Sequence, residues 1–192
     1  MSEWQSSPCD DVRETRRKLS DKGRLEEEAG FKLGRRDGLT RVFDENGALK
    51  EELNYRAGML DGICRWYYAS GQLRREATFH RGTLEGLSRT WHENGQIRDK
   101  WRFKNGKLTG AGQTYYENGT LKEEIHFSND KREGLSLVYD ENGRLKSETL
   151  FHEDMLHGMQ KQFNEDGTLL LARRYEYGQP VGSASGAPET KQ

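Results

Sequence analysis

The sequence has little of the features that mark several common classes of protein. Its 31 Lys and Arg residues almost balance its 32 Asp and Glu residues, and the net charge of −1 favours neither a nucleic-acid partner nor an anionic membrane surface. Its two cysteines, Cys9 and Cys64, lie far apart without a CxxC motif, so the sequence suggests neither a disulfide framework nor a zinc site. No apolar stretch reaches the roughly 20 residues of a membrane span, and the segment Met1 to Ser20 lacks the apolar run of a signal peptide. We therefore expect a soluble, cytoplasmic protein with two free thiols.

Hydrophobic residues are also few. They make up 32% of the chain against 33% charged residues, a ratio too thin for a compact layered domain and one that leans toward disorder. Aromatic residues nevertheless make up 10% of the chain, which is uncommon in disordered segments. An ordered repeat architecture, with much surface and a narrow core, reconciles the two observations.

Catalytic motifs are absent as well. The sequence has no HExxH motif and no nucleophile elbow, and its five histidines occupy different positions relative to the glycine pattern: His80, His92, His126, His152 and His157. Glu153 and Asp154, with two of these histidines, form the one group that resembles metal ligands, but they lie in an expected turn, where polar residues are common. We predict no catalytic, cofactor-binding or metal-binding residues and no cofactor, and therefore a protein that is not an enzyme.

What the sequence does contain is a repeat of 24 residues. A glycine recurs at this spacing in seven units, and positions in each unit are counted from it as offset 0: Gly23, Gly47, Gly71, Gly95, Gly119, Gly143 and Gly167. A second glycine stands at offset 11 in five units, with Asp130 and Asp154 in its place in the other two, and a third stands at offset 15 in all seven. This regular spacing indicates that the glycines are needed for their backbone conformation.

Each unit is expected to form a β-hairpin. The dipeptide Asn118-Gly119 is typical of a two-residue turn with positive φ at both positions, and residues 121–127 after it have the pattern of a strand. A broader turn, as in residues 58–62, then leads to a returning strand, as in residues 63–68. We predict an all-β fold: a repeat array of seven 24-residue β-hairpins, with about 14 strands in one elongated, twisted antiparallel sheet.

Apolar residues recur at four offsets of the unit. The first strand carries them at offsets 2 and 8, as in Leu121 and Phe127, and the returning strand at offsets 16 and 20, as in Leu135 and Tyr139. Because alternate residues of a strand point to one face, we expect these four columns to form one apolar face. The other face would then carry a ladder of Lys and Arg at offset 3 and a ladder of Glu at offset 5, which keep exposed strands from aggregating.

The segments ENGQIRDKWRFKNGKLTGAGQTYY and ENGTLKEEIHFSNDKREGLSLVYD resemble the MORN-repeat variant of the YwqK-like antitoxin and immunity family. The resemblance covers roughly Asp21 to Gly182 and joins the turn glycines to the leucine at offset 2 and the aromatic residue at offset 8. It implies a single elongated sheet of hairpins without catalytic chemistry, and an immunity protein or antitoxin that neutralises a polymorphic toxin by direct binding. The parent MORN repeats imply an alternative, a scaffold that self-associates or sits near a membrane. Apart from the two aspartates at offset 11, the departures from the pattern are at offset 13: Arg36, Arg132 and Pro180.

The repeat divides the chain into three segments. Residues 1–20 form an N-terminal segment, for which a capping strand and a short helix are both consistent with the sequence. Residues 21–182 hold the seven units of the repeat domain. Residues 183–192 are a tail of small and polar residues that we expect to be disordered.

The predicted function is protein binding on a repeated frame. A protein partner is expected, with a cognate toxin and a homodimer as alternatives, and no nucleic acid or membrane. Most outward positions of the returning strands are expected to be polar, whereas Trp66, Tyr68, His92 and Tyr116 break this pattern. The last three share offset 21 and would line up about 10 Å apart, with Trp66 beside them. Exposed aromatic residues are typical interface anchors, so we predict these four as the partner-binding residues, the alternative being that they cover a curled sheet or a self-association contact.

Overall fold

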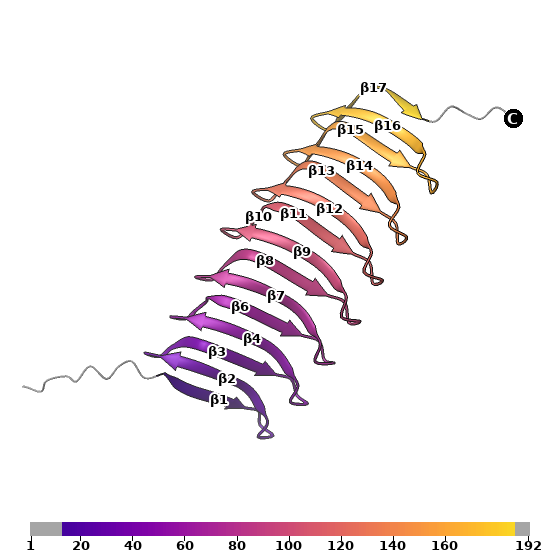
Figure 1. Ribbon diagram of the computed structural model, residues 1–192. Helices are drawn as coiled ribbons and strands as arrows, with labels where there is room; N and C mark the ends of the chain where they lie inside the picture. The colour runs from indigo at the N-terminus through magenta and orange to yellow at the C-terminus, as the bar shows by residue number, and fades with distance from the viewer. Residues whose placement is uncertain (1–12, 187–192) are drawn as a thin grey trace, which may run out of the picture. The chain divides into compact units, whose positions relative to one another are not determined.

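The protein is all-β. The computed structural model describes residues 13–186, which form 17 strands and no helix (Figure 1). Neighbouring strands pair antiparallel in hairpins, which confirms the predicted fold class. Within the described residues, no helix is long and apolar enough to cross a membrane. The chain divides into two compact units, Met1–Thr83 and Leu84–Gln192, which are described in turn.

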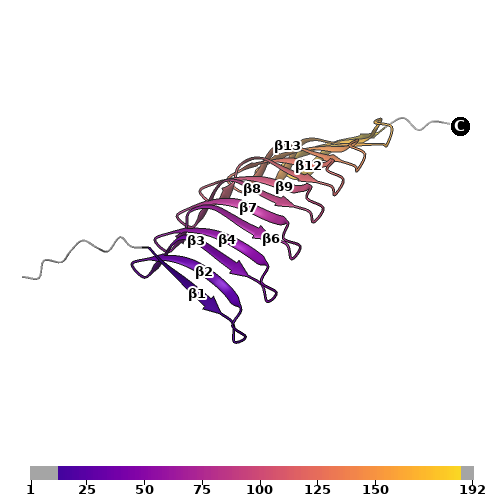
Figure 2. The same cartoon turned by 60° about the horizontal axis from the view of Figure 1, so that its bottom comes forward.

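The first unit is an antiparallel sheet in which each strand pairs with the next along the chain. Its strands are β1 (Glu14–Leu19), β2 (Leu25–Lys32), β3 (Arg35–Phe43), β4 (Leu49–Arg56), β5 (Met59–Leu60), β6 (Gly62–Tyr67) and β7 (Leu73–His80). The short β5 pairs with the end of β4, and β6 pairs with both β4 and β7. Figure 2 shows the turns of this unit gathered in two rows, one at each end of its strands.

The second unit repeats this arrangement. Its strands are β8 (Thr83–Trp91), β9 (Ile97–Lys104), β10 (Lys107–Leu108), β11 (Gly110–Tyr115), β12 (Leu121–Ser128), β13 (Lys131–Tyr139), β14 (Leu145–His152), β15 (Met155–Phe163), β16 (Leu169–Glu176) and β17 (Gln179–Gly186). Strand β8 begins at Thr83, which is the last residue of the first unit. The short β10 pairs with β9, and the others pair in chain order up to β17.

The ends of the repeat array differ from the sequence-based expectation. Residues 14–19 form strand β1, so a strand, not a helix, precedes the first full hairpin, while residues 1–12 lie outside the described residues. Residues 183–186, expected to begin a disordered tail, instead continue strand β17, in which Ser185 pairs with Ala172 and Gly186 pairs with Leu171 of β16. Residues 187–192 lie outside the described residues. Strand β1 and the division of two returning strands account for the excess over the predicted number of strands.

The two turns of the repeat have exchanged the types that the sequence predicts. The two-residue turn with positive φ at both positions lies at offsets 10 and 11, as in Ala57 (50°) and Gly58 (87°). In the Asn-Gly turn only the glycine has positive φ, 84° at Gly119, and the loop closes with bonds from Gly119 N to Tyr116 O (2.9 Å) and Tyr116 N to Thr120 O (2.9 Å). This is the longer hairpin loop in which a left-handed glycine follows an ordinary turn. Asp130, which replaces a glycine at offset 11, adopts the same left-handed conformation (70°).

The length of the turn at offsets 10 and 11 corrects the predicted apolar face. A two-residue turn places even offsets opposite odd ones, so offset 8 pairs with offset 13, as in Phe31 with Arg36. A register shift between Ala29 and Phe31 then adds two residues to the returning strand without changing this parity, so offset 6 pairs with offset 17, as in Ala29 with Thr40. The column at offset 16 therefore lies on the face of the charge ladders, where Leu39 is 37% exposed. The sequence predicts that offset 17 points outward, as in Thr40, Ser88, Ser136 and Gln160. Offset 17 lies on the face of the aromatic column instead, where Gln160 is half-buried and five members of the offset are buried: Thr40, Cys64, Ser88, Gly112 and Ser136.

We call the two faces the aromatic face, with offsets 4, 6, 8, 13, 17 and 19, and the charged face, with offsets 3, 5, 7, 16 and 18. The predicted column at offset 20 also reaches the charged face, because Tyr67 OH donates to Glu52 Oε2 (2.9 Å) and Lys100 Nζ donates to Tyr115 OH (3.1 Å). The β-bulge that separates offset 19 from offset 20 shifts the alternation there.

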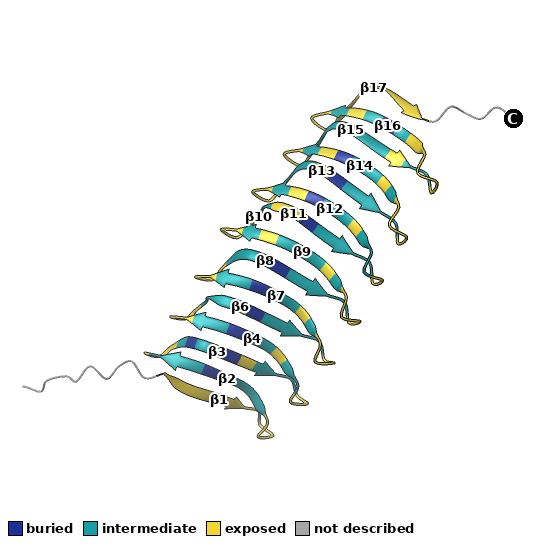
Figure 3. Ribbon diagram, viewed as in Figure 1, coloured by how far each residue is buried: buried dark blue, intermediate teal, exposed yellow. Residues whose placement is uncertain are grey.

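The core is a line of small and medium side chains along the middle of the aromatic face. In the first unit it contains Ala29, Thr40, Leu53, Cys64 and Ala77, and the buried positions form a band across the strands in Figure 3. The described residues contain no helix or second sheet that could cover this line. The long side chains of the same face, above all the aromatic column at offset 8, therefore have to cover it, which explains why the central positions are small.

In the second unit, Trp101 takes a position on this line, offset 6, that is small or medium-sized in every other repeat except the last, which has Arg173. It fits because Gly112 stands opposite it: a Cβ atom built on Gly112 would lie 2.3 Å from Trp101 Cζ3. The indole also contacts the ring of Phe127 edge to face, with centroids 5.8 Å apart. The glycine at this position therefore serves close packing.

Gly112→Val should lower the free energy of unfolding by about 1–3 kcal/mol, because its side chain overlaps the indole. The matched double variant, Trp101→Ile with Gly112→Ser, recreates the neighbouring Ile125–Ser136 pair and should melt close to the parent. Thermal and urea unfolding followed by circular dichroism would measure both. A Gly112→Val variant as stable as the parent would contradict this packing.

Candidate functional site

Trp66, the first predicted partner-binding residue, lies on the aromatic face of the first unit. It is half-buried, it contacts Phe79 with ring centroids 6.3 Å apart, and the guanidinium of Arg75 lies 5.1 Å from its ring. The sequence could not reveal this packing, because it depends on which residues the sheet register places opposite each other. Part of the indole remains accessible for a partner.

The three residues at offset 21 lie where the returning strand enters the Asn-Gly turn, and all are half-buried. In the second unit, His92 Nε2 lies 3.1 Å from Tyr115 O, and Tyr116 OH donates to Tyr139 O (2.9 Å). The side chains of His92 and Tyr116 thus contact the backbone of the following repeat. Tyr68 and Trp66 belong to the first unit, and His92 and Tyr116 to the second. That these four residues bind a partner stays a prediction.

A row of hydrogen bonds that sequence reasoning missed links four of the repeats to the next one. The acidic side chain at offset 14 accepts from the backbone N–H at offset 10 of the following repeat, as in Asp37 with Ala57 (3.1 Å) and Glu85 with Asn105 (2.7 Å). The acceptor satisfies the N–H of a residue with positive φ. The signal was present in the sequence as a recurring acid at offset 14: Asp37, Asp61, Glu85 and Glu133.

At two of these acids, the hydrogen bond lowers the pKa of the carboxyl group. The N–H of Ala57, followed by the charge of Arg13, lowers the pKa of Asp37. At Glu133, the N–H of Glu153 and then the contact with His152 lower the pKa of the carboxyl group. The same Glu133 contact, 3.0 Å from Oε1 to His152 Nδ1, raises the pKa of the imidazole.

The histidine cluster noted in the sequence is therefore a polar turn cluster. The rings of His152 and His157 lie 5.7 Å apart, and His157 contacts Tyr177 at 5.0 Å. Among residues 13–186, no group of three or more His, Cys, Asp or Glu side chains could hold a metal ion. Cys64 is fully buried, and burial raises the pKa of its thiol, which disfavours the reactive thiolate.

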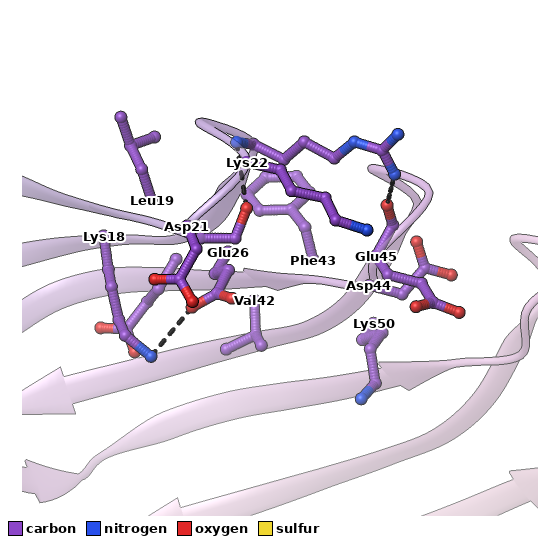
Figure 4. A pocket seen from close by; sticks show the side chains of 13 residues that line it. Lys18, Leu19, Asp21, Lys22, Glu26, Val42, Phe43, Asp44, Glu45 and Lys50 are labelled. Atoms are coloured by element: carbon purple, nitrogen blue, oxygen red, sulfur yellow. Dashed lines mark hydrogen bonds and ion pairs between the residues drawn. The ribbon is translucent and has the colours of Figure 1, made fainter.

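A hollow in the first unit lies between β1, β2 and β3 (Figure 4). Lys18 Nζ and Glu26 Oε2 form an ion pair across it (2.9 Å), and Arg24 donates to the backbone oxygen of Glu45. Val42 is among its apolar lining residues. These two contacts use the side chains of Lys18, Glu26 and Arg24 to join neighbouring strands and turns, which suits a structural role better than a catalytic one.

The charged face carries a ladder of ion pairs and hydrogen bonds between offsets 18 and 5. In the first unit, Arg41 Nε lies 3.2 Å from Glu52 Oε1, and in the second, Lys161 Nζ lies 2.9 Å from Glu148 Oε2. Since these side chains are partly exposed, each pair contributes little to stability. Together they set the charge pattern that a partner would meet.

Comparison with known proteins places this repeat in a family. The family model described as MORN repeat variant matches five segments, which together make up more than half of the chain: residues 36–57, 60–81, 84–105, 108–129 and 132–153. Each match ends within the two-residue turn described above or just before it. No curated protein shows significant similarity to the chain.

The contact between Glu133 and His152 makes stability depend on pH. The raised pKa of His152 means that its contribution is fully present below the ordinary value of 6.5 and is lost as the pH rises through the raised pKa. Glu133→Gln should move the NMR titration midpoint of the His152 ring protons down toward 6.5. Glu153→Gln, which removes a weaker and more distant charge, is the control and should move it less. An unchanged midpoint in Glu133→Gln would show that the contact does not form in solution.

Proposed function

The chain belongs to the MORN repeat variant family, and from that premise we propose that it works by binding another protein. MORN repeats are non-catalytic modules that bind proteins or membranes. The repeat presents its side chains in regular columns, which suits a binding role. Among the described residues, no group of three or more His, Cys, Asp or Glu side chains could hold a metal ion. The cytoplasmic location expected from the sequence is part of the proposal.

One observation carries the proposal: the charged face presents large aliphatic side chains to solvent. The exposed residues of this kind at offsets 7 and 16 are Leu39, Ile63, Leu135, Leu150 and Met159. A single-layer sheet does not need them for its core, which lies on the aromatic face. Exposed apolar residues that recur on one face are typical of protein interfaces.

Within this proposal, the partner is a toxin that the chain neutralises by direct binding. The resemblance to YwqK-like antitoxin and immunity proteins supports this role. A membrane-proximal scaffold is disfavoured, because the described basic residues near the N-terminus are paired with acids, as in Arg13 with Asp37 (2.8 Å) and Arg17 with Glu28 (2.8 Å).

The proposed function predicts a stoichiometric complex with a toxin encoded beside this gene. Co-expression of the chain should protect cells from the toxin, and size-exclusion chromatography of the two purified proteins should show a shared peak. A toxin that neither forms a complex nor is neutralised would contradict the antitoxin role. Flotation of the chain with anionic liposomes would instead favour a membrane scaffold.

The predicted partner-binding residues can be tested in the same assay. Trp66→Ser with Tyr116→Ser should abolish complex formation. Tyr116→Phe keeps the ring and removes the hydrogen bond to Tyr139 O, so it should cost about 0.5–1.5 kcal/mol of stability and leave binding intact. A double variant that still binds the toxin would exclude these residues as anchors.

A further inference from the structure

The charged face of the second unit carries an aliphatic cluster where the repeat elsewhere has polar groups. Leu137 stands at offset 18, where other repeats have Arg, Gln, Lys or Ser, and Leu150 stands at offset 7, where neighbouring repeats have His126 and Arg174. Leu135 and Met159, both at offset 16, flank Leu150. We call Leu135, Leu137, Leu150 and Met159 the aliphatic cluster.

The four side chains lie on adjacent strands of one face. Leu135 on β13 and Leu150 on β14 are direct cross-strand partners. The side chain of Leu150 extends over β15, because a Cβ atom built on Gly158 would lie 2.7 Å from Leu150 Cδ2. Leu135 and Met159 are each 42% exposed. The cluster is therefore continuous across three strands and open to solvent.

The frame of the repeat does not require these leucines. At offset 7, Asn54 and His126 contact the backbone oxygen at offset 16 of the returning strand, His126 Nδ1 lying 3.2 Å from Leu135 O. Leu150 cannot make this bond. Leu150 thus has an exposed aliphatic side chain in place of a recurring polar contact. This replacement points to a role other than holding the repeat together.

Leu137 also interrupts the ladder of ion pairs and hydrogen bonds between offsets 18 and 5, because its side chain has no polar group. Its direct cross-strand partners are Glu124 on one side and Glu148 on the other. Glu124 accepts from Gln113 (2.7 Å) and Glu148 accepts from Lys161 (2.9 Å), both on the sides away from Leu137. In the first unit the equivalent place between two glutamates belongs to Arg41, which lies 3.2 Å from Glu52 and 4.0 Å from Glu28. The second unit thus has two carboxylates without the cation that stands between their equivalents.

We propose that the aliphatic cluster is a docking surface for a protein partner that inserts a Lys or Arg side chain between Glu124 and Glu148 and packs apolar residues on Leu135, Leu150 and Met159. The partner supplies the cation that the repeat lacks at Leu137, and its apolar residues cover the exposed leucines. This inference rests on the proposed protein-binding function and names the chemistry of the partner.

The chemistry of the surface can be tested with three small probes: n-hexylammonium, hexan-1-ol and hexanoate. In methyl NMR spectra, n-hexylammonium should cause saturable shifts at the four residues of the aliphatic cluster. Hexanoate should bind about tenfold more weakly, because its charge is repelled by the two carboxylates, and hexan-1-ol should lie between. Absence of saturable shifts, or equal binding of the cation and the anion, would overturn the proposal.

Leu137→Arg is the decisive variant, because it restores the ladder that Arg41 completes in the first unit. It should keep or raise the melting temperature and abolish n-hexylammonium binding. Leu137→Met is the volume-matched control and should retain binding, and Ile63→Ser, at the offset of Leu135 but beside a complete ladder, should leave binding unchanged. Retained binding in Leu137→Arg would overturn the proposal.

The same variant separates this inference from the proposed function. If a toxin partner forms a complex with the parent and with Leu137→Arg alike, the docking surface is wrong and the proposed function stands. If n-hexylammonium binds as described and no toxin is bound or neutralised, the surface stands and the antitoxin role fails. Loss of toxin binding in Leu137→Arg but not in Leu137→Met supports both.

Discussion

The two-residue turn at offsets 10 and 11 decides which side chains share a face in each repeat. Because it contains two residues, even offsets of the first strand stand opposite odd offsets of the returning strand, as in Ile125 with Ser136. Aromatic side chains therefore share a face with small buried residues, and the glutamates share a face with arginines and exposed aliphatic residues. The core line, the charge ladder and the aliphatic cluster all depend on this parity. A turn of three or five residues would move each side chain of the returning strand to the opposite face of the sheet.

The turn has a conformational cost that the neighbouring repeat offsets. Non-glycine residues at offset 10, such as Ala57 and Glu153, adopt positive φ, which is unfavourable for L-residues. Their N–H groups are bound by carboxylates of the preceding repeat, from Asp37 and Glu133 respectively. A sheet of one layer has few other contacts between distant parts of the chain, so its stability resides in such nearest-neighbour interactions.

The sequence contains enough information to predict the period, the positions of the strands and the positions of the turns, because glycine spacing reports local backbone geometry. It does not show which side chains of the returning strand lie on which face of the sheet, because residues 58–62 are compatible with a turn of an even or an odd number of residues. The contact of Trp66 with Phe79 and the pairing of Trp101 with Gly112 depend on register between strands, which no local pattern determines. Leu137 and Leu150 were visible as departures from their columns, but their adjacency to Glu124 and Leu135 follows only from the strand pairing.

The hydrogen bonds that run from the N–H at offset 10 to the acid at offset 14 all point in one direction along the chain. The acceptor at offset 14 precedes its donor by 20 residues, as in Asp61 with Arg81 and Glu133 with Glu153. On the ribosome, each carboxylate therefore emerges before the N–H that it will bind, and a repeat cannot complete its contacts until the first strand of the next one has been synthesised. A pause in translation between the two residues therefore leaves the acid at offset 14 without this hydrogen bond until the next strand has been added.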